Sequence, residues 1–459
     1  NDPNNIINHL DYDYATNGFT GDGASGTSMD SLRMVGTLSL TANGVYLDNT
    51  TNLSIDNSVI SVAGSYGIYA QNANNSSITN SSIDGTYSEA AIKMESCLGC
   101  TVNNNTISSN PYRGIWMDYG FNTVITNNTM DVDYYGIQAR DGSYYSLNGN
   151  TIRLHNLQEQ GDERAIYFTS SEYCTINNNH ITSSSYVYYA TMIYNTSGNT
   201  QAIINNNYIE LGIDAYDSTQ CNFYSPSGNS YSAYSVRAIY VENPQEIKSN
   251  TILQNQYYDG QAIRVWQSDS YNVPLTIENN HIEIFSRYEW DDNSAAIYVN
   301  NSTNFTAATL IKNNTIEIYN GANVGIYARN NTDIIDNTIS FGDRYAQQCG
   351  MSQYGDYLRA IDVDDSDHHI IRNNTITNFA RGIELNSSTD NIVDSNYIHT
   401  LSLYTTINGS TSDWANDNYG IYANNSDSLF ITANTIKTGS GTLIYQTNGA
   451  STIKYNLLE

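Results

Sequence analysis

The sequence predicts an all-β protein, a right-handed parallel β-helix (solenoid) of about fifteen coils with long loops along one edge. Three observations predict it. A unit whose compact form is 22–24 residues long repeats along the chain, and a pair of apolar residues five positions apart recurs fifteen times. An Asn stands two places before the last apolar residue in thirteen of these fifteen units. Together they indicate a solenoid that grows along one axis.

The repeated unit has the alternation of β-strands. Representative stretches are GIYAQNANNSSITNSSI, GIYARNNTDIIDNTI and GIYANNSDSLFITANTI. Apolar and polar residues alternate within Gly-Ile-Tyr-Ala-x-Asn, which is the period expected of a half-buried strand. The five-residue step runs unbroken from Ile55/Ile60 to Ile453/Leu458. Such units are too short for a β-α-β crossover but long enough for three short strands, so like positions of neighbouring coils should lie about 4.8 Å apart.

The recurrent Asn marks a tight turn between two strands. We expect it to adopt left-handed dihedral angles and its amide to bond to the amides of neighbouring coils, which is a structural role. Ser58 and Ser81 take its place in the first two units, and the Asn residues are Asn105, Asn128, Asn150, Asn179, Asn207, Asn250, Asn280, Asn314, Asn337, Asn374, Asn396, Asn434 and Asn456.

These repeats resemble the parallel β-helix repeats of the pectate-lyase-like superfamily, in particular its carbohydrate-binding and sugar-hydrolase type. The resemblance covers residues 44–459, and residues 1–43 are expected to form an N-terminal segment and partial cap. It implies the fold, whereas the superfamily contains lyases, hydrolases, epimerases, tailspikes and structural surface proteins. The Arg-x-Pro-x-x-Arg motif of pectate lyases and the Gly-His-Gly motif of polygalacturonases are missing from the sequence. Whether the chain is an enzyme is therefore left open.

Composition excludes some partners. The chain carries 18 Lys and Arg against 46 Asp and Glu, a net charge of −28, which opposes binding to nucleic acid. Only 14% of the residues are charged, while Asn, Ser, Thr and 40 Tyr dominate, so the surface suits sugars. No apolar run approaches the roughly 20 residues of a membrane span. A start at Asn1 fits a processed mature protein or a fragment, and we expect an extracellular or cell-surface location.

Sequons and cysteines agree with that location. The chain holds seventeen Asn-x-Ser/Thr sequons, many of them by-products of the Asn-Asn-Thr-Ile element. The preferred glycosylation sites are Asn49, Asn195, Asn304, Asn386 and Asn408. Among the five cysteines, Cys97 and Cys100 are close enough for a local disulfide, and Cys221 and Cys349 could join two long inserts. Free buried thiols are the alternative.

The outward positions of the first strand form an aromatic-rich stripe. Aromatic rings stack on the apolar faces of sugars, although Tyr is also selected in sheets for packing alone. Long inserts at 155–163, 212–235, 286–294, 342–358 and 402–418 should emerge along one edge and could wall a groove there. The expected carbohydrate-binding residues are Tyr69, Trp116, Tyr167, Tyr240, Trp266, Tyr298 and Tyr327.

Two clusters of charged residues could carry chemistry. Lys93, Glu95, Asp118 and Arg140 fall on three successive coils, where paired carboxylates could share acid and base duties beside a cation that neutralises a uronate. Ordinary cross-strand ion pairs are the alternative. The second cluster is Asp362, Asp364 and Glu384, an all-oxygen set suited to Ca²⁺. Calcium is the cofactor that the sequence suggests.

Two functions follow. The first is an extracellular, glycosylated surface or filament protein with a structural or carbohydrate-binding role, which associates end to end because the C-terminal coil lacks a cap. The alternative is a polysaccharide lyase or glycoside hydrolase that acts in a groove on the first-strand face. Glycans are the expected partners of both.

Overall fold

A computed structural model describes most of the chain. The described residues are 6–8, 11–12, 19–23, 26–37, 43–155, 162–183, 189–196, 201–211, 216–217, 222–223, 236–256, 260–286, 294–319, 324–342, 358–400, 418–438 and 441–459. The inserts expected along one edge, and with them Cys221, Cys349 and Asn408, lie almost wholly outside these residues.

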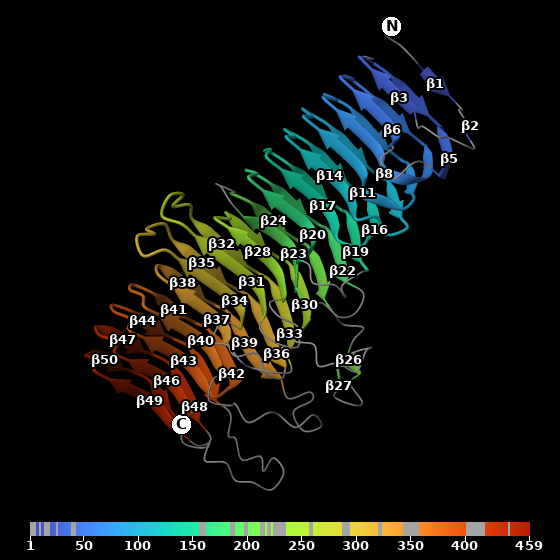
Figure 1. The fold of residues 1–459 in the computed structure, drawn as a ribbon. Helices are drawn as coiled ribbons and strands as arrows, with labels where there is room; N and C mark the ends of the chain where they lie inside the picture. Colours follow the sequence, from blue (N-terminus) through green and yellow to red (C-terminus); the bar gives the residue numbers. More distant parts are fainter. Residues whose placement is uncertain are drawn as a thin grey trace. The chain divides into compact units, whose positions relative to one another are not determined.

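The fold is an all-β parallel solenoid (Figure 1). Each coil supplies one strand to each of three parallel sheets, and each strand pairs with the equivalent strand of the next coil. Throughout the part of the chain that the structure describes there is no helix, and hence none that could span a membrane. The predicted fold class is confirmed, and the number of coils is close to the predicted one.

The chain divides into two compact units, of which unit 1 holds Asn1–Ser185 and Tyr189–Ile209. Its first sheet consists of β3 (Phe19–Asp22), β6 (Asn43–Asp48), β8 (Val59–Gln71), β11 (Tyr87–Glu95), β14 (Arg113–Asp118), β17 (Tyr135–Arg140), β20 (Asp162–Thr169) and β23 (Tyr189–Thr196). The second consists of β1 (Ile6–Asn8), β4 (Ser28–Asp30), β7 (Ser54–Asp56), β9 (Ser77–Thr79), β12 (Thr101–Asn103), β15 (Val124–Thr126), β18 (Ser146–Asn148), β21 (Thr175–Asn177) and β24 (Ile203–Asn205). The third consists of β2 (Asp11–Tyr12), β5 (Arg33–Thr37), the start of β8, β10 (Ser82–Asp84), β13 (Thr106–Ser108), β16 (Thr129–Val132), β19 (Thr151–Leu154), β22 (His180–Ser183) and β25 (Tyr208–Leu211).

Unit 2 holds Glu210–Glu459 and has the same three sheets. The first sheet consists of β28 (Val236–Glu242), β31 (Gly260–Gln267), β34 (Ala295–Asn301), β37 (Val324–Arg329), β40 (Arg359–Asp364), β43 (Arg381–Asn386), β46 (Tyr419–Asn424) and β49 (Thr442–Thr447). The second consists of β29 (Glu246–Lys248), β32 (Leu275–Glu278), β35 (Thr309–Lys312), β38 (Thr332–Ile335), β41 (Ile370–Arg372), β44 (Ile392–Asp394), β47 (Leu429–Thr432) and β50 (Ser451–Lys454). The third consists of β30 (Thr251–Gln256), β33 (His281–Ser286), β36 (Thr315–Tyr319), β39 (Thr338–Gly342), β42 (Thr375–Phe379), β45 (Tyr397–Thr400), β48 (Thr435–Thr438) and β51 (Leu457–Leu458). Apart from these sheets, β26 (Tyr216–Asp217) pairs antiparallel with β27 (Asn222–Phe223).

The core is a column of aliphatic side chains inside the coils. Ile92 pairs in register with Ile115, which pairs with Ile137, and all three side chains are fully buried. Burial of each such side chain contributes about 1.5–3 kcal/mol. Because strand side chains alternate, the residues that flank each core Ile point outward, which fixes the outer face of the first sheet.

The recurrent Asn residues form a buried ladder. Asn105 Nδ2 donates to Asn128 Oδ1 at 3.0 Å, and Asn128 Nδ2 donates to Asn150 Oδ1 at 3.0 Å. The expected coil-to-coil bonds are therefore present, but the left-handed dihedral angle falls one residue earlier. Asn104 and Asn127 have φ of 55° and 54°, because the residue at the tip of the turn, and not the buried one after it, must reverse the backbone.

The N-terminal segment also supplies strands. β1 pairs with β4, and β4 pairs with β7. Likewise β3 pairs with β6. Where the structure describes residues 1–43, they continue the three sheets of unit 1.

Candidate functional site

The charged cluster of unit 1 lies on the outer face of three neighbouring strands, β11, β14 and β17. Lys93 pairs in register with Trp116, and Glu95 pairs with Asp118. Asp118 pairs in turn with Arg140 on the next coil. The structure thus brings together the four residues that the sequence proposes as catalytic.

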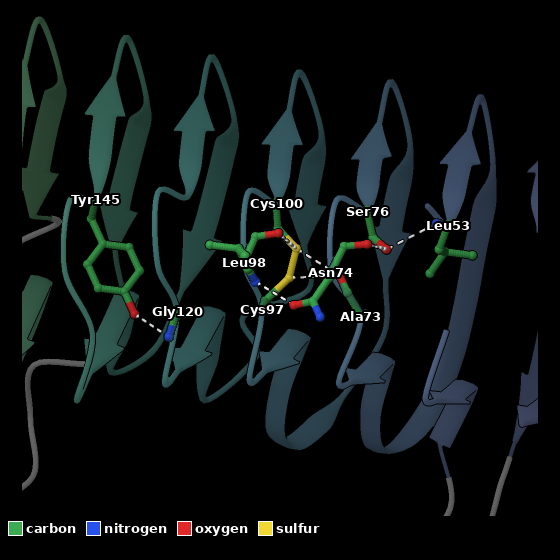
Figure 2. The surroundings of a disulfide bond; sticks show 9 residues. All are labelled: Leu53, Ala73, Asn74, Ser76, Cys97, Leu98, Cys100, Gly120 and Tyr145. Atoms are coloured by element: carbon green, nitrogen blue, oxygen red, sulfur yellow. Dashed lines mark hydrogen bonds between the residues drawn. A yellow bond between two sulfur atoms is a disulfide. The ribbon is translucent and has the colours of Figure 1, made fainter. Parts of the chain in front are cut away.

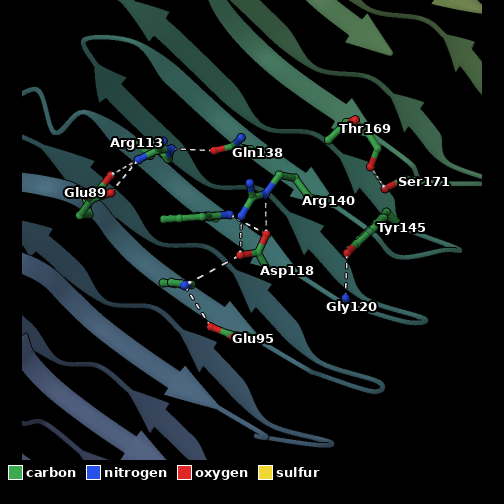
Figure 3. A network of polar contacts seen from close by, with 12 residues as sticks. Glu89, Glu95, Arg113, Asp118, Gly120, Gln138, Arg140, Tyr145, Thr169 and Ser171 are labelled. Atoms are coloured by element: carbon green, nitrogen blue, oxygen red, sulfur yellow. Dashed lines mark hydrogen bonds and ion pairs between the residues drawn. The ribbon is translucent and has the colours of Figure 1, made fainter. Parts of the chain in front are cut away.

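Asp118 is the centre of this cluster (Figure 3). Arg140 Nε donates to Asp118 Oδ1 at 2.8 Å, and its terminal nitrogen donates to Oδ2 at 2.9 Å. Trp116 Nε1 donates to the same Oδ1 at 2.8 Å, and Lys93 Nζ lies 3.8 Å from Oδ2. The carboxylate is buried, and charged and neutral donors satisfy both of its oxygens.

Glu95 is held in the same way. Lys93 Nζ lies 3.0 Å from its carboxylate, and the Tyr69 hydroxyl donates to Glu95 Oε2 at 2.7 Å. Burial alone would raise the pKa of Glu95, but the hydrogen bonds from Tyr69 and Lys93 outweigh burial and lower it. A general acid must hold a proton at the working pH. The cluster therefore supplies anions and cations in balance, and its proposed catalytic role stays a prediction.

Trp116 is surrounded by cations. The charged groups of Lys93, Arg113 and Arg140 lie 4.2, 4.5 and 5.0 Å from a Trp116 ring centroid. The side chain is only 9% exposed. Cation–π contacts stabilise the strand face, each by about 0.5–2 kcal/mol. They also occupy the ring that the sequence assigns to a sugar.

The tyrosines of the stripe are also used within the protein. Tyr298 and Tyr327 stack at 4.7 Å with an interplanar angle of 10°. Tyr167 stacks on Tyr135 at 5.7 Å and 20°. Tyr298 and Tyr327 are register partners, and the coil spacing of about 4.8 Å is close to a stacking distance, so these two rings cover each other's faces. The rings of the stripe thus pack mainly along the strand face.

Tyr69 and Tyr240 lie beside cations. Lys93 Nζ is 4.9 Å from the Tyr69 ring centroid. The guanidinium carbons of Arg237 and Arg264 are 5.2 and 5.3 Å from that of Tyr240. Both tyrosines are half-buried. Their predicted carbohydrate contacts stay predictions.

Trp266 is the exception in the stripe. It is the last outward-facing residue of β31, and its side chain is 41% exposed. Among the described residues, no ring or cation packs on its indole, unlike that of Trp116. Its register partners are Glu242 on β28 and Asn300 on β34. Trp266 therefore presents an open aromatic surface between a carboxylate and an amide.

The carboxylates expected to bind calcium are paired with guanidinium groups. Arg359 contacts both Asp362 and Glu384 at 2.9 Å, and Arg381 contacts Glu384 at 2.8 Å. Within the described ranges no group of three or more His, Cys, Asp or Glu residues is placed to hold a metal ion. Guanidinium groups neutralise the charge that a cation would neutralise. Calcium binding stays a prediction.

Asp364 and Asp362 differ in their surroundings. Asp364 is half-exposed and accepts a hydrogen bond from Arg329 at 3.1 Å. Asp362 is 3% exposed, and its Oδ1 has no hydrogen-bond partner. Burial raises the pKa of Asp362 to about 7, an effect larger than the opposing attraction of Arg359. Asp362 can therefore hold a proton near neutral pH.

Cys97 and Cys100 form a disulfide in the turn after β11 (Figure 2). Both lie beside the carbonyl oxygen of Ala73 on the preceding coil. Cys174 is a free, buried thiol. Burial raises its pKa to about 12, so it is unreactive.

The described sequons differ in access. Asn49 and Asn304 are exposed, and Asn386 is half-exposed. Asn195, in contrast, is fully buried on β23, and neither atom of its amide has a hydrogen-bond partner. A glycan on Asn195 would require local unfolding. The repeat could have shown this, because Asn195 follows the outward Tyr194 and strand alternation then turns Asn195 inward.

Sequence reasoning missed the arginines that precede the core Ile by two positions. The signal is Arg-Gly/Ala-Ile, which occurs five times and places Arg three residues before the first outward residue. Arg359 and Arg381, two of these arginines, each form an ion pair with an acidic residue, and Arg113 packs on Trp116. The motif occurs at Arg113, Arg164, Arg237, Arg359 and Arg381.

Several solved structures are similar to this chain at low sequence identity. DFA-IIIase from Arthrobacter chlorophenolicus is 11% identical, over 80% of this chain and 83% of that chain, with a TM-score of 0.40. An exopolygalacturonase from Thermotoga maritima is 11% identical, over 79% and 88%, with a TM-score of 0.33. A tailspike protein of an Escherichia coli bacteriophage, solved with a hexasaccharide, is 10% identical, over 98% and 73%, with a TM-score of 0.35. Likenesses this distant carry no argument about activity.

No curated protein matches the sequence. A family model described as "Right handed beta helix region" matches residues 43–209 and 261–459, which is more than half of the chain. The chain therefore belongs to the right-handed β-helix family.

Proposed function

We propose that this protein is an extracellular, carbohydrate-binding β-helix and that a saccharide stacks on Trp266. The open indole of Trp266, the one exposed ring of the seven proposed sugar-binding aromatics, carries this proposal. Indole rings stack on the C–H faces of sugars and combine a large apolar area with little conformational entropy to lose. The other six are half-buried or buried.

The polar neighbours of Trp266 suit a hydroxyl-rich ligand. Glu242 and Asn300 stand on either side of it in register, about 4.8 Å away along the coils. A carboxylate accepts hydrogen bonds, and an amide both donates and accepts them. A stacked ring flanked by such groups is a common composition of a sugar site, with apolar contact for affinity and polar contacts for orientation.

The extracellular part of the proposal is supported by the sequons and the disulfide. Asn49 and Asn304 are exposed, and a Cys97–Cys100 disulfide persists in oxidising surroundings. Asn386 is a half-exposed acceptor. End-to-end association into filaments stays a prediction, which sedimentation over a concentration series tests.

The test of the function compares two exposed aromatic residues of unit 2. Phe430, 49% exposed on the second sheet, is the control for Trp266. Binding to a panel of polysaccharides is measured by calorimetry for the protein and for the variants Trp266→Ala and Phe430→Ala. We expect Trp266→Ala to weaken binding about tenfold or more, the effect of losing about 1.4 kcal/mol of stacking, and Phe430→Ala to change nothing. Equal binding by both variants would refute the proposal.

A polysaccharide lyase or glycoside hydrolase is the second candidate, favoured by one observation on the same face. Asp362 and Glu384 are register partners, one able to hold a proton and the other fixed by Arg359 and Arg381. A proton-holding acid beside an anion is the pairing that glycoside hydrolysis uses. Release of reducing ends by the protein but not by Glu384→Gln supports it, while absence of cleavage across the panel refutes it.

A further inference from the structure

We propose that the ligand of Trp266 is an oligosaccharide of at least two sugar residues, one stacked on Trp266 and the next on Tyr271. This inference rests on the proposed function, since it extends the site of the same tryptophan. It follows from the turn after β31, which holds a second open aromatic ring beyond the end of the strand.

Tyr271 is the second exposed aromatic residue of this part of unit 2. Its side chain is 37% exposed, against 41% for Trp266. Among the residues that the structure describes between 236 and 342, every other Trp, Tyr or Phe is buried or half-buried. Within the same part of the chain, neither a ring nor a cation packs on the Tyr271 ring. Tyr271 therefore offers ring surface to a ligand, as Trp266 does.

The backbone limits the distance between the two rings. Trp266 is the last outward-facing residue of β31, and Gln267 after it is fully buried. The amide of Tyr271 donates to the carbonyl oxygen of Ser268 at 3.3 Å, which closes a β-turn. Two residues of chain and one such turn place the Cα atoms of Trp266 and Tyr271 at most about 14 Å apart. Since the two rings do not contact each other, this range suits neighbouring residues of one oligosaccharide.

Side chains on both sides of Tyr271 fasten its turn to the turn of the next coil. Asn272 Oδ1 accepts a hydrogen bond from the amide of Thr306 at 2.9 Å, and Asn272 Nδ2 donates to Thr306 Oγ1 at 2.6 Å. Asp269 Oδ2 accepts a hydrogen bond from Asn304 Nδ2 at 3.0 Å. A ring on a turn that is already ordered loses little freedom when a sugar stacks on it, so more of the stacking energy appears as affinity.

The lengths of the turns set the direction of the ligand. Seven residues, 268–274, join β31 to β32, and seven, 302–308, join β34 to β35, whereas three residues join β28 to β29 and two join β37 to β38. The two long turns therefore form a ledge at the ends of β31 and β34. Along the solenoid axis, the register partners of Trp266 are Glu242 and Asn300, which carry no ring. The oligosaccharide thus runs along the strand direction, from the strand face onto the ledge.

The experiment varies the length of the ligand. Oligosaccharides derived from glucans, mannans, xylans and galactans, each from the monosaccharide to the hexasaccharide, are titrated into the full chain by calorimetry. In a series that binds, we expect affinity to rise about tenfold or more up to the di- or trisaccharide and then to level off, because the second sugar binds intramolecularly. A monosaccharide that binds too weakly to measure sets a lower limit to this rise.

Variants of Tyr271 test the cause of the rise. Tyr271→Ala should remove most of it and leave the affinity of the monosaccharide unchanged, whereas Tyr271→Phe should keep it, because stacking needs the ring and not the hydroxyl. The matched control is Tyr397→Ala, at a tyrosine 38% exposed on β45 of the third sheet, which should change neither value. Asn272→Gly, which frees the turn and suits its φ of 21°, should reduce the rise in part. Thermal melts of all variants check that the fold is kept.

The outcomes separate the two proposals. An affinity that does not depend on ligand length, or a rise that persists in Tyr271→Ala, overturns the inference and leaves binding at Trp266 intact. Equal weakening of monosaccharide binding by Tyr271→Ala and Trp266→Ala also overturns it, since one sugar would then lie between both rings. Oligosaccharide binding that is insensitive to Trp266→Ala overturns the proposed function. Absence of binding in every series overturns both.

Discussion

Arg140 holds Asp118 with two parallel hydrogen bonds, of 2.8 and 2.9 Å, between neighbouring coils of unit 1. Such a bidentate pair fixes the relative position of two side chains as well as neutralising them. Asp118 also accepts from Trp116, so the pair anchors the cations that surround that ring. The cluster thereby fastens β14 to β17.

Loss of this pair should destabilise the protein. We expect Arg140→Ala to lower the free energy of unfolding by about 1–2 kcal/mol, because a buried carboxylate loses two charge-assisted donors while Arg140 itself is partly solvated. Chemical denaturation measures the change. Arg153→Ala is the control, since Arg153 is exposed on the third sheet. Equal losses in the two variants would contradict a special role of the pair.

Asn128, a member of the buried Asn ladder, should contribute more to the stability of the fold than Asn127, the turn residue beside it. Asn128→Ala removes the acceptor of Asn105 Nδ2 and a donor to the Val102 carbonyl oxygen, and leaves buried polar groups unpaired. We expect a loss of about 2–4 kcal/mol in the free energy of unfolding. The control is Asn127→Gly, at an exposed turn residue with φ of 54°, where Gly should be neutral. Denaturant midpoints of the two variants decide the matter.

His369 should make the protein less stable in acid. Burial lowers its pKa to about 4 in the folded protein, whereas an unfolded His has a pKa of about 6.5. The unfolded state therefore binds the proton first, and stability falls as the pH drops from about 6.5 to about 4, then levels off. Midpoints measured across this window should show the fall, which His369→Asn should reduce. An unchanged slope in that variant would exclude His369 as the cause.

Asp362 should have the opposite effect. Burial raises its folded pKa to about 7, so the folded protein holds a proton that the unfolded chain has released. Its contribution is complete below the unfolded pKa of about 3.9 and is lost as the pH rises through about 7. Asp362→Asn keeps a polar acceptor for Arg359 and should remove this loss. The measurement is the difference in unfolding free energy between pH 5 and pH 8 for the two proteins.

Much of the fold could be predicted because the constraint is local and repeated. Each coil repeats the alternation around a core Ile, as at Ile92 and Ile115, and a shift of one residue would turn every apolar side chain outward. The repeat therefore fixes the register, which places Lys93 beside Trp116 and Asp118 beside Arg140. The candidate residues could be identified in the same way.

The roles of these residues could not be predicted so well. The sequence places Trp116 and Trp266 on the same outward face, yet cations surround one and leave the other open. Asp362 and Glu384 have the composition of a calcium site, but Arg359 reaches both from its own coil. Such differences depend on where the charged groups of long Lys and Arg side chains lie, which the repeat pattern does not specify.

The sequence by itself determined the solenoid, its coil register and the faces on which each residue lies, because strand alternation and a strict repeat leave one arrangement that buries the Ile column. Only the tertiary structure decided which outward groups are available. Stacked coils bring each side chain within about 4.8 Å of its neighbours, and the pairing of rings, cations and carboxylates across that distance uses most of them. Trp266 remains open because its neighbours, Glu242 and Asn300, carry neither a ring nor a cation.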